Sequence, residues 1–113
     1  MPPIGVKAVV LSPTTVLVTW TDTSLGRNQR ISDGRYYTVR YNPKLIRKPR
    51  LVNASDLNLH LDDLRPDTEY EFSVRVVKNP RQSTWSLSVF NRTQEAGQLL
   101  NHVADHFINM CTM

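Results

Sequence analysis

The stretch 64–76 constrains the fold of this chain more than any other part of its sequence. Pro66 fixes its own φ angle and has no N–H to donate, while Asp67 and Thr68 have short side chains that bond nearby backbone. These residues predict a sharp corner. Residues 69–76 then alternate, with apolar side chains at the even positions and polar ones at the odd positions. This period of two predicts a strand with one buried face immediately after the corner.

Five other stretches show a similar alternation or a short apolar run. They are 6–11, 15–21, 37–41, 57–61 and 89–93. Turn-forming residues separate them, and no helical periodicity intervenes, which is typical of a two-sheet antiparallel sandwich. A Tyr placed like Tyr70 forms the tyrosine corner of such sandwiches, in which its hydroxyl returns to upstream backbone. The spacing Leu64-x-Pro66-x-Thr68-x-Tyr70 resembles that of fibronectin type III domains.

We therefore expect an all-β, seven-stranded antiparallel immunoglobulin-like sandwich over residues 6–94, preceded by a linker at 1–5. A chain of 113 residues is long enough for one hydrophobic core, and its single cysteine, Cys111, allows no internal disulfide. Trp20 is expected to pack against Tyr70 and Phe72. The predicted core residues are Trp20, Tyr37, Val39, Leu64, Tyr70, Phe72 and Val74.

Further motifs carry a more specific resemblance. The segments 19–24, 35–40 and 70–74, and above all Val77-Lys78-Asn79 followed by Ser83-Thr84-Trp85-Ser86, resemble one type III repeat of the netrin-receptor class that contains DCC, neogenin and protogenin. The resemblance implies a non-catalytic adhesion or ligand-binding module, or a spacer, in the extracellular portion of a single-pass plasma-membrane receptor of the guidance or adhesion type. Its implied ligands are netrins or repulsive guidance molecules. The alternatives are a heparan-sulfate-binding adhesion module of another cell-surface protein and an intracellular type III domain, as in giant muscle proteins.

Charge and aromatic residues outside the core define the candidate binding residues. The formal net charge is +4, and Lys44, Arg47, Lys48 and Arg50 cluster in one run. This run predicts either contacts with heparan sulfate or an acidic protein face, or simply a solvated loop. Lys78 and Arg81 would extend the patch only if the fold brings the two loops together.

Trp85 has two possible roles. It is either an exposed anchor for a partner or a ring stacked between Arg40 and Arg75 in cation–π contacts, and the stacked arrangement is favoured.

Two sequons, Asn53-Ala54-Ser55 and Asn91-Arg92-Thr93, are candidates for N-glycosylation in an extracellular module. Asn53 is expected in a polar loop and is the stronger candidate. Asn91 lies in the last expected strand, so its use requires an outward side chain.

The residue patterns favour neither an enzyme nor a nucleic-acid-binding protein. The sequence has no Gly-rich phosphate loop and no nucleophile–base set, and no cofactor is expected. The basic run contains no aromatic residues on which bases could stack. No stretch is long and apolar enough to insert into a membrane.

The segment 95–113 is expected to be a tail, either disordered or a short amphipathic helix with Leu99, Val103 and Phe107 on one face. His102 and His106 in this tail lack a recognised metal-ligand spacing.

Overall fold

The computed structural model describes residues 1–26 and 30–96, and regular structure in these residues consists of β-strands. The strands are β1 (Ile4–Val10), β2 (Val16–Thr21), β3 (Tyr36–Pro43), β4 (Arg50–Ala54), β5 (Asn58–Leu61), β6 (Glu69–Lys78), β7 (Arg81–Gln82) and β8 (Val89–Arg92). No helix that could cross a membrane occurs in the part of the chain described. The tail predicted over 95–113 lies almost wholly outside these residues.

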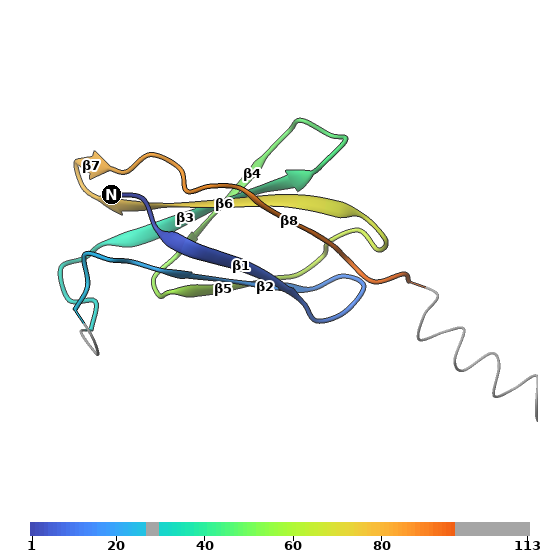
Figure 1. Ribbon diagram of the computed structural model, residues 1–113, viewed down its shortest axis with the longest axis horizontal. Coiled ribbons are helices and arrows are strands. Elements are labelled where there is room, and N and C mark those ends of the chain that lie inside the picture. Colours follow the sequence, from blue (N-terminus) through green and yellow to red (C-terminus); the bar gives the residue numbers. More distant parts are fainter. Residues whose placement is uncertain (27–29, 97–113) are drawn as a thin grey trace, which may run out of the picture.

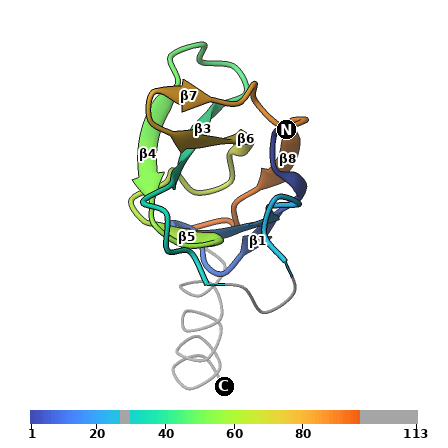
Figure 2. The same cartoon turned by 90° about the vertical axis from the view of Figure 1, so that its left-hand side faces the viewer.

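The strands form two antiparallel sheets that face each other as the layers of a sandwich (Figures 1 and 2). The smaller sheet has the order β1-β2-β5. The larger has the order β4-β3-β6-β7, and β8 also pairs with β6. Because β7 and β8 pair with opposite ends of β6, they form two parts of one interrupted edge. The predicted all-β sandwich is confirmed.

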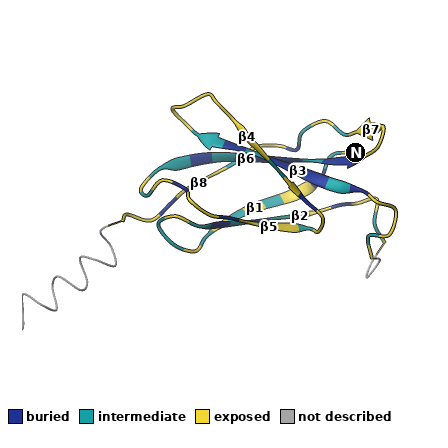
Figure 3. Ribbon diagram, turned by 180° about the vertical axis from the view of Figure 1, so that it is seen from behind, coloured by how far each residue is buried: buried dark blue, intermediate teal, exposed yellow. Residues whose placement is uncertain are grey.

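The core lies between the sheets, and Figure 3 shows buried residues on strands of both layers. Burial alternates along β2, for example, where every second residue is buried. All seven residues expected there are at most 5% exposed. The aromatic rings form two groups. Trp20 packs against Tyr37 at 5.5 Å between ring centroids, whereas Phe72 and Tyr70 pack with Tyr41. The ring partner recorded for Trp20 is thus Tyr37 and not the expected Tyr70 or Phe72, because Tyr37 lies at the same end of the sandwich.

The corner before β6 forms as expected. The backbone N–H of Arg65 donates to the Tyr70 hydroxyl at 2.8 Å, so the tyrosine corner is present. Asp67 has a φ of 47°, in the left-handed region that Asp tolerates better than most residues. The Thr93 hydroxyl, next to β8, accepts from the N–H of Thr68 and donates to the carbonyl of Arg65. The corner is therefore held by Tyr70 on β6 and by Thr93 next to β8.

The strand boundaries differ from the expected ones in three places. β1 begins at Ile4, inside the segment 1–5 expected as a linker. β4 covers Asn53, which was expected in a loop, because residues 50–54 pair along the edge of β3. The two-residue strand β7, like β4, lies outside the stretches that the sequence pattern indicated, and eight strands are described where seven were expected.

Candidate functional site

The outer surface of the larger sheet, which points away from the core, carries an ordered stack around Trp85. The guanidinium carbon of Arg40 on β3 lies 4.2 Å from the Trp85 ring centroid, and that of Arg75 on β6 lies 4.5 Å from it. Arg40 also donates from Nε to the Ser73 hydroxyl at 3.2 Å. Both cations lie over the ring face, the geometry of a favourable cation–π contact. The structure thus has Trp85 in the stacked arrangement, half-buried against its own sheet.

Serine side chains hold the segment 83–88, which links β7 to β8, against β6. The hydroxyls of Ser83 and Ser86 accept hydrogen bonds from the backbone N–H groups of Val76 and Val74, at 3.0 and 2.9 Å. In return the N–H groups of Ser83 and Ser86 donate to the carbonyls of the same two valines. The segment therefore supplies hydrogen-bond partners to the backbone of β6 at this edge of the sheet without being a regular strand.

This arrangement exposes two apolar side chains that the sequence analysis missed. Leu87 follows Ser86 and is 90% exposed, and Phe90 on β8 is 51% exposed. Phe90 pairs with Glu71, an outward residue of β6, and its ring lies 5.9 Å from the Lys44 ammonium. Strict alternation along β8 would have predicted that the Phe90 side chain points outward. The exposure of Leu87 could not be predicted from alternation, because the backbone of 83–88 is irregular and sets the direction of its side chain.

The candidate basic residues do not form one patch. Lys44, Arg47 and Lys48 lie in the loop between β3 and β4, and Arg50 begins β4, at the end of β3 where Pro43 pairs with Tyr70. Lys78 and Arg81 lie in the β6–β7 hairpin at the opposite end of β3 (Figure 1). Lys78 is also paired with Asp33 at 3.4 Å. The fold therefore does not let these two residues extend the basic run.

The two sequons lie in different surroundings. Asn53 is exposed on edge strand β4, and its Oδ1 accepts a hydrogen bond from the Thr38 hydroxyl at 3.1 Å. Asn91 is also exposed, but its Nδ2 donates to the carbonyl of Ala8 on β1 at 2.7 Å and so bridges the two sheets. The hydroxyl-bearing residue of that second sequon, Thr93, is 3% exposed.

The long loop between β2 and β3 is clamped at its two ends by buried charge. Asp22 accepts hydrogen bonds from Arg35 at 2.8 Å and from the Tyr37 hydroxyl at 2.7 Å, and both ionic side chains are at most 4% exposed. Asp33 binds the other side of the Arg35 guanidinium at 2.6 Å. Ser24 also donates to Asp22. The two ends of the loop therefore have a structural role.

This network shifts the pKa values of its members. Burial acts to raise the pKa of Asp22, but hydrogen bonds from Ser24, Tyr37 and Arg35 outweigh it and hold that pKa below 3.8. The hydrogen bond from Arg35 is the main cause of a lowered pKa at Asp33. Burial, then the hydrogen bond to Asp22, raises the pKa of Tyr37. All these shifts favour the charge states that hold the clamp together. Among the described residues, no group of His, Cys, Asp or Glu could hold a metal ion.

Comparison with known protein families identifies the domain. The fibronectin type III domain family matches residues 1–92. The chain belongs to this family. The tyrosine corner and the sheet orders described above agree with that assignment.

The chain is also similar to neogenin and to the netrin receptor DCC. It is 45% identical over 97 residues to neogenin of Rattus norvegicus and of Homo sapiens, a match that covers 84% of this chain and 7% of each relative. It is 43% identical over 98 residues to the netrin receptor DCC of Mus musculus, covering 85% of this chain and 7% of the receptor. The resemblance to the DCC and neogenin class is therefore confirmed. The chain spans only about 7% of the length of these relatives.

Solved structures share the fold at lower identity. The fn3 domain of human contactin 1 has a TM-score of 0.71 at 22% identity, over 85% of this chain and 79% of that one. The FN5 domain of Drosophila Lar has a TM-score of 0.67 at 20% identity, over 85% of this chain and 100% of that one. These likenesses support the fold alone.

Proposed function

We propose that this domain is a ligand-binding module in the extracellular portion of a single-pass guidance or adhesion receptor. Its ligand is a secreted protein of the netrin or repulsive guidance molecule class. The identity of 42–45% to neogenin and to the netrin receptor DCC over most of the chain supports the receptor assignment. That DCC is a netrin receptor supports a netrin-like ligand.

The observation that carries this proposal is the exposure of Leu87 beside a rigid support. Exposed aliphatic side chains are common, but most of them are scattered and mobile. Leu87 instead directly follows Ser86, whose side chain and backbone are both bonded to Val74. The stacked Trp85 lies on the other side of Ser86. An apolar side chain on an ordered backbone loses little conformational entropy on binding, which suits it to be a contact residue.

The test is binding of the 113-residue chain to immobilised netrin and repulsive guidance molecule, with Leu87→Ser as the variant. We expect at least a tenfold loss of affinity, the size of effect typical of a central contact residue. Leu45→Ser is the matched control, because Leu45 is 95% exposed and lies in the β3–β4 loop. Binding that tolerates Leu87→Ser as well as Leu45→Ser would contradict the proposed surface. A chain that binds neither ligand would contradict the function.

A further inference from the structure

The strand β4 has an open edge. It pairs with β3 on one side, and no strand pairs with its other side in the part of the chain described. Figure 2 shows β4 at the left-hand border of the molecule, away from β1 and β8. Outside the ladder with β3, no backbone hydrogen bond is recorded for residues 50–54. The backbone groups on this edge are therefore available to a further strand.

The other edges of the two sheets carry features that hinder pairing with another chain. β1 has a register shift near its start, and the carbonyl of Ala8 accepts a hydrogen bond from the side chain of Asn91. The outer edge of β6 is divided between β7, the serine-bonded segment 83–88 and β8. β5 has only four residues, and its exposed side chains, those of Asn58 and His60, are polar. Bulges, interruptions and short polar strands are the usual protection of a sheet edge.

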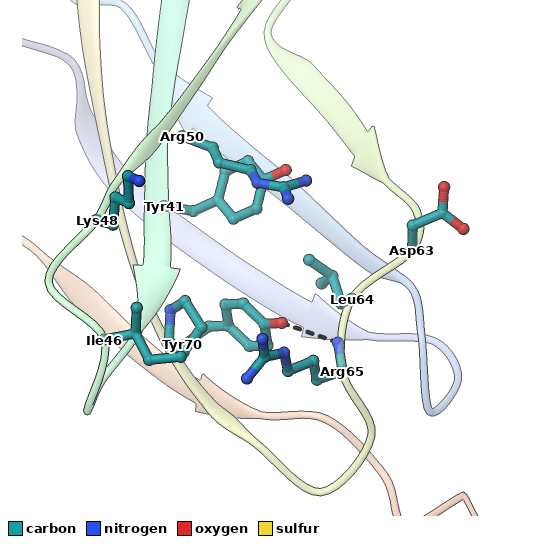
Figure 4. Close-up of a pocket in the computed structure, with 9 residues that line it drawn as sticks. Tyr41, Ile46, Lys48, Arg50, Asp63, Leu64, Arg65 and Tyr70 are labelled. Carbon is teal, nitrogen blue, oxygen red and sulfur yellow. Dashed lines mark hydrogen bonds between the residues drawn. The ribbon is translucent and has the colours of Figure 1, made fainter.

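β4 instead offers a regular edge that is apolar at its centre. Its five residues pair with β3 without a register shift. Leu51 is 56% exposed on the outer face, opposite Arg40. Val52 is half-buried on the inner face. Arg50 lies on that face too, where Figure 4 shows its side chain extending across the ring of Tyr41. The middle of β4 therefore presents an apolar side chain on each face of the sheet.

From these observations we infer that β4 pairs antiparallel with β4 of a second copy of this chain, and that a glycan on Asn53 prevents the pairing. A two-fold arrangement centred on Val52 pairs all five residues. It sets Arg50 opposite Ala54, so no like charges lie directly opposite each other. The two Val52 side chains then face each other, and the two Leu51 side chains are diagonal neighbours within reach of contact. The edge is thus self-complementary.

The position of Asn53 gives a glycan control over this edge. In the two-fold arrangement Asn53 lies directly opposite Leu51 of the second copy, on the same face of the joined sheet. Its Oδ1 accepts from the Thr38 hydroxyl, which leaves Nδ2, the atom that carries an N-linked glycan. Paired strands are only about 4.8 Å apart, so a bulky glycan at this point occupies the place of the second strand. The inference does not rest on the proposed function, because Leu87 belongs to another surface.

The test compares the unglycosylated 113-residue chain, produced in bacteria, with the same chain secreted from mammalian cells. Sedimentation is measured up to about 0.5 mM, where submillimolar dissociation constants are visible, with a reducing agent to keep Cys111 from forming disulfides. The unglycosylated chain is expected to rise from its monomer mass of 13.0 kDa towards twice that mass. The glycosylated chain is expected to remain monomeric. Asn53→Gln from the same mammalian cells is expected to associate as the bacterial chain does.

Leu51→Glu in the bacterial chain tests the edge itself. It places two negative charges at diagonal positions of the paired strands and is expected to weaken association at least tenfold, roughly 1.4 kcal/mol, because the charges repel and lose the apolar contact. Leu45→Glu is the matched control, because Leu45 is 95% exposed in the β3–β4 loop and the change in net charge is the same. The control is expected to change association by less than about threefold, as a surface substitution does.

Amide hydrogen exchange locates the contact without any variant. In the unglycosylated chain, raising the concentration is expected to slow exchange at amides within 50–54 and to leave β5 and β7 unchanged. A chain that stays monomeric, that gains protection elsewhere than in β4, or whose association survives Leu51→Glu would overturn the inference. A mammalian chain that associates with its Asn53 glycan in place, or that is secreted without this glycan, would overturn the role given to the glycan.

Discussion

The buried ion pair of Asp22 and Arg35 determines how the ends of the β2–β3 loop are held. Its atoms are 2.8 Å apart, and the Tyr37 hydroxyl and Ser24 complete the hydrogen bonding of the carboxylate. A buried pair contributes little net stability over an apolar replacement, but removing Asp22 leaves the buried Arg35 with only the partly exposed Asp33 as an ionic partner. The cost of a single substitution here therefore exceeds the value of the contact itself.

Asp22→Asn is expected to lower the free energy of unfolding by about 3 kcal/mol at pH 7, because it removes the charge that faces buried Arg35. The wild-type chain is expected to lose stability as the pH falls below about 3.8, because the pKa values of Asp22 and Asp33 are lower in the folded state. Their contribution is fully present above the unfolded pKa and disappears as each carboxylate is protonated in the folded state. Urea unfolding followed between pH 7 and pH 2 measures both effects.

Asp62→Asn provides the control, because Asp62 is 65% exposed and contacts only His60 among the recorded ion pairs. This variant is expected to remain within about 0.5 kcal/mol of wild type. Asp22→Asn is also expected to lose less stability than wild type between pH 4 and pH 2. An Asp22→Asn variant with wild-type stability and wild-type pH dependence would refute the structural role of the clamp.

The segment 83–88 and β6 form one structural unit in which side-chain hydroxyls replace regular strand pairing. Ser86 is 8% exposed, and its hydroxyl both accepts from the N–H of Val74 and donates to the carbonyl of Leu87. Trp85 and its two arginines cover the same stretch of β6 from outside. The position of Leu87 thus depends on the hydroxyl of its neighbour Ser86 and on the two arginines of β3 and β6 that hold Trp85.

Ser86→Ala is expected to destabilise the domain by about 1–3 kcal/mol, because it leaves the Val74 N–H without that acceptor. The same variant is expected to weaken binding of the protein ligand, since Leu87 loses its ordered support. Hydrogen exchange at Val74 and ligand affinity are the two measurements. Ser88→Ala is the matched control on an exposed position of the same segment. Unchanged exchange at Val74 in Ser86→Ala would show that the backbone pairing holds without the hydroxyl.

The two edges of the larger sheet, β4 and β8, place the two sequons differently relative to the body of the domain. Asn53 lies on an outer edge, where the recorded hydrogen bond engages its Oδ1, the atom that does not carry a glycan. Asn91 lies at the seam between the sheets, with its Nδ2 bonded to Ala8. A glycan on Asn91 would attach to the atom that bridges the sheets, next to a Thr93 that is committed to the corner.

For the chain secreted from mammalian cells, we therefore expect one N-linked glycan, on Asn53. Asn53→Gln is expected to abolish the mass shift that enzymatic deglycosylation causes, and Asn91→Gln is expected to leave it unchanged. Intact mass measured before and after deglycosylation checks both variants. The opposite pattern, with the glycan lost only in Asn91→Gln, would show that the folded environment of the two asparagines does not determine which sequon is glycosylated.

The local pattern of the sequence was sufficient for much of the fold. Alternation over 69–76 predicted β6, and the corner before it predicted a hydrogen bond between the Tyr70 hydroxyl and upstream backbone, which the structure shows at the N–H of Arg65. Alternation works here because a strand with one buried face sorts its side chains by parity. It failed for β4, whose edge position leaves Arg50 and Leu51 exposed and removes the apolar signal. The stacking of Trp85 was expected from the outward placement of Arg40 and Arg75 on neighbouring strands.

The sequence by itself determined the sandwich, the core and the family, because these depend on periodicity and on motifs within a few residues of one another. Only the tertiary structure decided the functional surfaces. It separated Lys78 from the β3–β4 loop, left β4 at an open edge of the larger sheet, and turned Leu87 outward. The physical reason is that strand register and corner geometry set the distances between residues remote in sequence, and a sequence pattern carries no measure of those distances.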